Sequence, residues 1–245
     1  MSSNNIQVPS ATANFGGSGS MSATVSIWQP FAVQHLWTAL HMARLCNDRE
    51  DELVARGKMG PDVEHQSLAA TAAMSAVYFV EAYINDVYAM AADDNGTLRS
   101  QLNGIDSRAA ELLGLVWKGT DVAAEKWQIL EKYQYALAVA GRPKMAAGQN
   151  PFQDMQQLIK LRDTLAHFKS EWQRHDVPHK VETSLKNRFP DSRLYAGVPW
   201  FPQVCLASGC AKWACDTSMA FVDSWRGEMG MEFDYKTTVA SMPEP

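Results

Sequence analysis

The pattern of hydrophobic and polar positions predicts α-helices over most of the 245-residue chain. Residues 29–57 carry apolar side chains among polar ones, behind the Gln29-Pro30 pair and ahead of Gly60-Pro61. Because proline favours the start of a helix and a Gly-Pro pair interrupts one, this segment is predicted to be one long amphipathic helix.

Residues 62–93 are rich in alanine and apolar on nearly every side. A helix without a polar face is typical of the buried centre of a bundle, so we expect this helix to be central. The run Asp93-Asp94-Asn95-Gly96 ends it, and two shorter helices are predicted over 106–117 and 120–140.

The next helix is predicted to begin with Asn150 as its N-cap and Pro151 at its first position, and to run to about Arg174. Its apolar residues recur at spacings of three and four and should be buried: Leu158, Leu161, Leu165, Phe168 and Trp172. Ser208 opens a last helix that reaches about Trp225. A later group of aromatic residues is expected in the core: Trp200, Phe201, Trp213, Phe221 and Trp225.

These elements predict an all-α fold in one helical domain over 25–228. Residues 1–24, rich in Ser, Gly and Asn, are expected to form a disordered tail, and residues 229–245 a flexible one. Translation could begin at Met1 or at Met21.

Composition favours an ordinary globular protein, with 46% hydrophobic and 20% charged residues. No run approaches the roughly 18 uninterrupted apolar residues of a membrane helix, and the N-terminal residues lack the features of a signal peptide. Four cysteines without a C-x-x-C pair favour reduced thiols. We therefore expect a soluble, cytoplasmic protein that uses no metal and no cofactor.

The net charge of −5 argues against a protein that coats nucleic acid with its whole surface. Residues 160–193 nevertheless contain eight basic and five acidic residues, a local charge of +3. These are either ordinary solvated charges or a confined basic patch for an RNA or nucleotide phosphate.

Two residues of the 151–174 helix suggest phosphate chemistry. Arg162 could grip a phosphate through its permanently charged guanidinium, and His167 could transfer a proton near neutral pH. Metal-free RNA cleavage, in which the ribose 2′-OH attacks phosphorus, needs both functions. On a regular helix the two side chains lie about 140° apart. They would converge only in a distorted helix or across a dimer axis; otherwise Arg162 ties two helices together and His167 caps or lines a surface.

The Arg-x(4)-His motif resembles the HEPN superfamily. The likeness covers about residues 60–225 and includes Ala76–Asn85. Three further segments are most similar to a group of bacterial HEPN-like proteins: Leu161–Trp172, Arg188-Phe189-Pro190 and Cys205–Ala211. The resemblance implies an antiparallel helical bundle, commonly dimeric. Many members are metal-independent ribonucleases of toxin–antitoxin and antiviral systems, and others are non-catalytic.

By this resemblance, Arg162 and His167 form the catalytic pair, the protein is a homodimer, and its partners are an RNA or a nucleotide and an antitoxin. Asp163 stands where the family most often has Asn; its carboxylate accepts hydrogen bonds but adds negative charge beside the phosphate. The rival interpretation is a non-catalytic HEPN-like module that binds a nucleotide or a protein.

A carboxylate and an amide lie one turn apart in the central helix. Glu81 stands in an apolar run, where a buried charge without a partner would be costly, so we expect it to be paired. Asn85 shares its face. The pair is predicted either to orient Arg162 or to act as a structural hydrogen-bond pair within the bundle.

His175 and His179 flank Asp176 in a pattern that suggests a metal site. Pro178 disturbs the helix on which ligands four residues apart would align, so a metal is not predicted here.

Overall fold

The computed structural model describes residues 28–93, 99–119, 124–170, 172, 174 and 176–243, and these are helical with no strand. The all-α prediction is therefore confirmed. The helices are α1 (Ala32–Ala55), α2 (Val63–Ala91), α3 (Ser107–Lys118), α4 (Ile129–Val139), α5 (Phe152–Ala166), α6 (Lys180–Leu185), α7 (Ser208–Met229) and α8 (Tyr235–Ala240). Short turns of other helical types are η1 (Arg99–Leu102), η2 (Ala124–Lys126) and η3 (Trp200–Val204).

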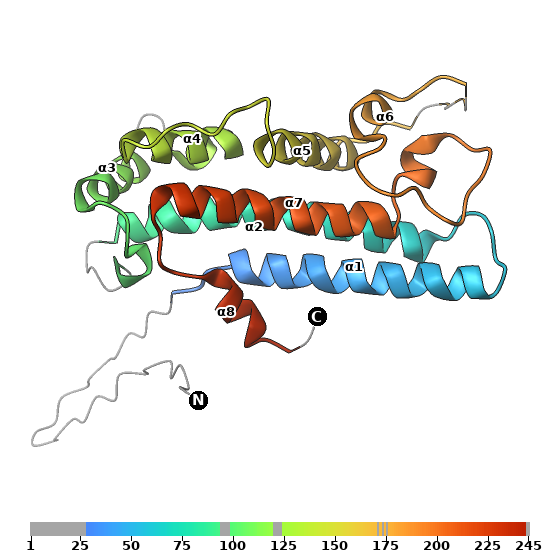
Figure 1. Ribbon diagram of the computed structural model, residues 1–245, viewed down its shortest axis with the longest axis horizontal. Coiled ribbons are helices and arrows are strands. Elements are labelled where there is room, and N and C mark those ends of the chain that lie inside the picture. The colour runs from blue at the N-terminus through green and yellow to red at the C-terminus, as the bar shows by residue number, and fades with distance from the viewer. Residues whose placement is uncertain are drawn as a thin grey trace, which may run out of the picture.

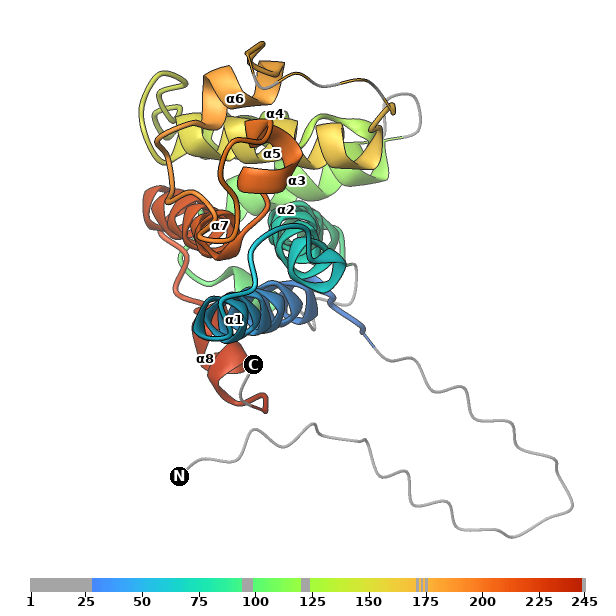
Figure 2. The same cartoon turned by 90° about the vertical axis from the view of Figure 1, so that its right-hand side faces the viewer.

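The long helices alternate in direction. In Figure 1 the chain runs rightwards along α1, back along α2, rightwards again through α4 and α5, and back along α7. Figure 2 views this bundle nearly end-on, with α1, α2 and α7 grouped together and α3, α4 and α5 in a layer above α2 and α7. The helix α2 contacts α1, α3, α4, α5 and α7 and is therefore the centre of the bundle, as its composition predicts.

Small side chains let the neighbours of α2 approach closely. Its alanines Ala69, Ala72, Ala73 and Ala76 are fully buried. By length and composition α2 could also cross a membrane, but 56% of its most apolar stretch is already buried inside the bundle. Such burial is expected for the core helix of a globular protein.

Buried aromatic side chains tie the layers together through hydrogen bonds as well as packing. The hydroxyl of Tyr133 on α4 donates to the carbonyl oxygen of Val80 on α2 over 2.7 Å, and the Trp225 indole on α7 donates to the Tyr133 carbonyl over 3.0 Å. Because each polar tip has a partner, these large rings can be fully buried. The core prediction for Trp200, Phe201, Trp213, Phe221 and Trp225 is confirmed.

The buried carboxylate of Glu50 connects several segments of the core through hydrogen bonds. Glu50 lies on α1 with 1% of its surface exposed. It accepts hydrogen bonds from Nε2 of His65 on α2 (3.0 Å), from the backbone N–H of Arg193 (2.9 Å) and from the backbone N–H of Ser208 at the start of α7 (3.0 Å). One side chain thus fastens two helices and a connecting segment to α1.

The prediction for α5 is wrong at both ends. The helix begins at Phe152 with Pro151 in the N-cap position, and Asn150 does not cap it. It ends at Ala166 instead of Arg174. Its apolar stripe meets the bundle as far as Leu165: Leu158 and Leu161 are buried and Leu165 is partly buried against the core, whereas Phe168 is 45% and Trp172 fully exposed. Without burial of the stripe, tertiary packing no longer sustains the helix.

The C-terminal segment is also more ordered than predicted. Residues 229–245 were expected to be flexible, but they include α8, which packs against α1. Tyr235 of α8 is fully buried, and its hydroxyl donates to Asp223 of α7 over 3.0 Å. The short helix α6 was not predicted either. The expected disordered tail, residues 1–24, lies outside the described residues.

The carboxyl group of Asp86 on α2 gives a first prediction. Burial raises its pKa to about 6, an effect that the backbone N–H of Ala32 at the start of α1 partly offsets. Because the folded state binds this proton more tightly than the unfolded state, stability should fall as the pH rises from about 4 through 6. The Asp86→Asn substitution should therefore stabilise the protein by about 1 kcal/mol at pH 8 and have no effect at pH 4. Thermal unfolding at both pH values checks this; an unchanged or lower melting temperature at pH 8 would contradict it.

Candidate functional site

His167 lies just beyond the last turn of α5. Its backbone N–H still bonds to the carbonyl oxygen of Asp163 over 3.0 Å, but its φ and ψ angles of −115° and 25° are not helical. Its side chain is exposed. The angle of 140° expected for a regular helix therefore does not describe how His167 lies relative to Arg162.

A shallow hollow of about 360 Å³ surrounds His167. The described residues that line it are Asp163, Thr164, His167, Phe168, Lys169 and His179. It thus brings together two imidazoles, one ammonium group and one carboxylate. These groups come from the end of α5, the segment that follows it and the start of α6.

His179 is held in place by two contacts. Its ring stacks on that of Phe201, with centroids 4.6 Å apart and planes at 18°, and its Nδ1 accepts a hydrogen bond from the backbone N–H of Val181 over 3.1 Å. Because Nδ1 accepts, we assign the ring proton to Nε2. In this tautomer Nε2 of His179 is a hydrogen-bond donor.

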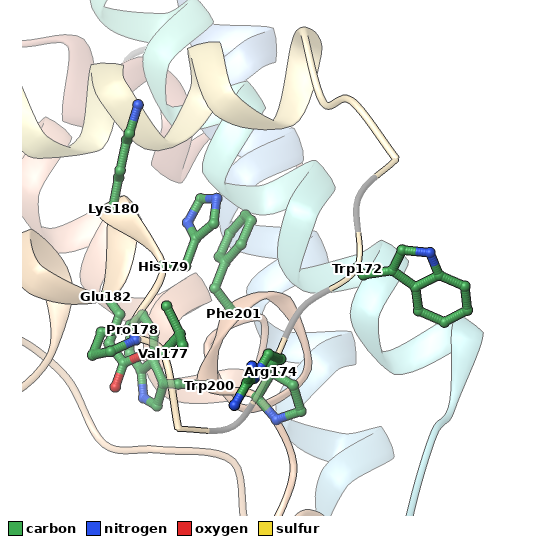
Figure 3. Close-up of a pocket in the computed structure, with 10 residues that line it drawn as sticks. Trp172, Arg174, Val177, Pro178, His179, Lys180, Glu182, Trp200 and Phe201 are labelled. Carbon is green, nitrogen blue, oxygen red and sulfur yellow. The ribbon is translucent and has the colours of Figure 1, made fainter.

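A second pocket of about 380 Å³ adjoins the hollow and shares His179 with it. Figure 3 shows His179 and Phe201 face to face at its centre, with Arg174 below them and Trp172 projecting away on the connection between α5 and α6. Trp172 is fully exposed, and Arg174 forms an ion pair with Asp176 at 2.6 Å. Exposed aromatic and cationic side chains therefore alternate along this connection.

Arg162 does not enter the hollow. Its Nε lies 3.0 Å from Oδ1 of Asp163, and 21% of its side chain is exposed. Arg162 is not among the described residues that line the space around His167. Asp163 therefore lies beside both members of the predicted pair, but the buried Nε of Arg162 makes no hydrogen bond to a described residue.

Glu81 and Asn85 of α2, which we expected to orient Arg162, do not bond to it among the described residues, and Asn85 binds a residue of α4 instead. Glu81 is only half-buried, so its charge does not require the partner that we expected. Oδ1 of Asn85 accepts a hydrogen bond from Nζ of Lys132 on α4 over 2.7 Å, and the Lys132 side chain is fully buried. Within the described part of the chain, no hydrogen bond or ion pair joins Arg162 to Glu81 or Asn85. The prediction that this pair orients Arg162 is wrong, because Asn85 stabilises the buried lysine of α4 instead.

The part of the chain that the structure describes contains no group of three or more His, Cys, Asp or Glu residues placed to hold a metal ion. His175 of the metal hypothesis lies outside it. The four cysteines are buried and unpaired, and burial raises the pKa of the Cys46 and Cys215 thiols to about 12.

The sequence did not single out Lys169 or the exposed Trp172 as parts of this site, and it considered His179 only as a metal ligand. A signal was present in the run from Lys169 to Pro178, where polar residues interrupt the apolar stripe and a proline follows. Such a run favours a connection over a helix, and a tryptophan within it is exposed.

The fold and these hollows define an all-α bundle protein with a histidine- and lysine-lined surface site at the end of one helix. Searches against protein-family models, curated proteins and solved structures each found no match to this chain.

Proposed function

We propose that this protein is a metal-independent endoribonuclease of the HEPN type, with His167 as its proton-transfer residue. The observation that carries the proposal is that exposed His167 shares one hollow with Lys169 and His179. Those groups supply a proton acceptor, a cation and a neutral N–H donor, which together suit a phosphodiester.

In this proposal His167 takes the proton of the ribose 2′-OH as its oxygen attacks phosphorus. The bond from phosphorus to the 5′-oxygen breaks, and the departing oxygen takes a proton from water. Lys169 and the Nε2–H of His179 stabilise the charge that develops on the non-bridging oxygens. The products carry a 2′,3′-cyclic phosphate and a 5′-hydroxyl.

Arg162 has a different role here from the one its motif predicts. By pairing with Asp163, it reduces the negative charge that this carboxylate would present to a phosphate. Lys169 supplies within one chain the cation expected from Arg162. Homodimerisation, an antitoxin partner and a cytoplasmic location stay predictions.

The rival function is a non-catalytic module that binds a nucleotide or a protein. The position of Arg162, paired with Asp163 outside the hollow, favours this alternative. Expression of the wild type and the His167→Ala variant in a bacterial host separates the two: slow growth and broken RNA with the wild type alone support the enzyme. Equal growth with intact RNA from both, at equal levels of folded protein, supports the module.

The exposed aromatic residues beside the hollow are expected to stack on the bases of single-stranded RNA. Trp172→Ala should weaken the binding of a labelled oligouridine by about 1–3 kcal/mol, as observed for such stacking residues. Because Trp172 is fully exposed, the melting temperature should not change. Fluorescence anisotropy with the His167→Ala background, which prevents cleavage, measures this. Trp28→Ala, which removes another exposed tryptophan, is the matched control, and equal affinities of the two variants would reject the stacking role.

A further inference from the structure

A separate groove lies between α1 and the N-terminal half of α7. Its volume is about 770 Å³, more than twice that of the hollow at His167, and the residues lining the two do not overlap. The segment from Arg188 to Arg193 forms its third side. Its size suits a small organic ligand.

The walls of this groove are mainly apolar. They include Leu40 and Ala43 of α1, Phe189 and Pro190 of the connecting segment, and Trp213 of α7. The rings of Phe189 and Trp213 lie 5.2 Å apart and pack at 42°. An apolar ligand body would therefore lose water on several sides at once.

The cations of the groove differ in how far they are already neutralised. Arg188 is paired with Asp154, Arg193 with Glu50 and Asp51, and Lys212 with Asp216. Arg44 is exposed, its guanidinium contacts only the ring of His41, and it forms no ion pair with a carboxylate of the described residues. Arg44 can therefore attract an anion.

One lining residue of the groove carries a polar hydrogen that has no acceptor among the described residues. Trp213 is only 8% exposed, and its buried Nε1 donates to no atom of the described residues. A buried N–H without an acceptor is costly, so an oxygen atom of a ligand would stabilise this site.

We propose that this groove binds a carboxylic acid with an apolar body. Arg44 supplies the cation, Trp213 the N–H donor, and Leu40 and Phe189 the apolar wall. The proposal is independent of RNA cleavage, because the two sites share no residue.

Isothermal titration calorimetry of the full chain with octanoate tests the proposal, with octylamine and octanol as comparators of the same chain length. Octanoate should bind with one site per chain and at least tenfold more tightly than either comparator, because both lack the negative charge that Arg44 attracts. Absence of octanoate binding at millimolar concentration, or equal affinity for octylamine, would overturn it.

Two variants locate the binding. Arg44→Ala should weaken octanoate binding about tenfold, while Arg108→Ala, which removes an exposed cation from α3, should leave it unchanged. The indole N–H signal of Trp213, assigned by its loss in Trp213→Phe, should shift as octanoate is added to ¹⁵N-labelled protein. Equal effects of the two arginine variants, or an unmoved Trp213 signal, would place the ligand elsewhere and reject the proposal.

Discussion

Replacement of Glu50 by alanine is expected to destabilise the protein by about 3–5 kcal/mol, the largest effect on folding of any substitution considered. The variant leaves the buried His65 ring and the partly buried backbone N–H groups of Arg193 and Ser208 without their acceptor. Total stabilities are about 5–15 kcal/mol, so this loss is a large share. Urea unfolding followed by circular dichroism measures it.

The neighbouring carboxylate is the matched control. Asp51 also pairs with Arg193, at 2.7 Å, but both side chains are about half exposed. Asp51→Ala should therefore cost less than about 1 kcal/mol. Equal losses in the free energy of unfolding for Asp51→Ala and Glu50→Ala would show that the buried hydrogen bonds of Glu50 contribute little to stability.

The pH dependence of the free energy of unfolding should reveal the ionisation of Glu50. Burial by itself would raise the pKa of Glu50, but hydrogen bonds from His65, Ser208 and Arg193 outweigh burial and hold it well below its usual range. The stabilisation is then complete above the unfolded pKa of about 4.3 and is lost as the pH falls below that value. Glu50→Gln should make the acid side of the stability curve flatter, and it serves as the milder variant if Glu50→Ala does not fold.

The second large effect concerns activity. His167→Ala should lower the rate of RNA cleavage by about 10²- to 10⁴-fold, the usual contribution of a positioned general acid or base. Because His167 is exposed and only its backbone N–H makes a described hydrogen bond, the melting temperature should hold within about 1 °C. Cleavage of a fluorogenic single-stranded RNA in the presence of a chelator gives the rate.

A histidine outside the hollow provides the control for that variant. His41 lies on α1, stacked on Trp37 with centroids 4.8 Å apart, and does not line the hollow. His41→Ala should cleave RNA like the wild type. A similar loss of RNA cleavage in both variants would indicate a general effect on the fold and argue against a catalytic role of His167.

The sequence predicts most of the helices because their signals are local. The apolar composition of 62–93 identifies α2 as the central helix, and Asp93 and Gly119 mark true breaks near helix ends. The end of α5 is different, since Phe168 and Trp172 continue the apolar spacing but are exposed. Periodicity alone does not reveal where a packing partner stops.

The hydrogen bonds of Glu50 and Asn85 could not be predicted from the sequence because the residues that they join are distant along the chain. Glu50 bonds to residues 143 and 158 positions later, and in α1 it resembles any polar residue of a solvated face. Asn85 likewise meets Lys132, 47 positions away. Of the predicted pair, His167 lines a surface hollow and Arg162 does not, whereas His179, which follows Arg162 by 17 positions, also lines it.

The ends of the RNA products test the central claim most directly. Purified protein in a chelating buffer should cleave a single-stranded oligoribonucleotide to fragments with 2′,3′-cyclic phosphate and 5′-hydroxyl ends, and a 2′-deoxy substitution at the cleaved position should block that cut. Intact RNA, or identical cleavage by the wild type and His167→Ala, would contradict a ribonuclease built around His167.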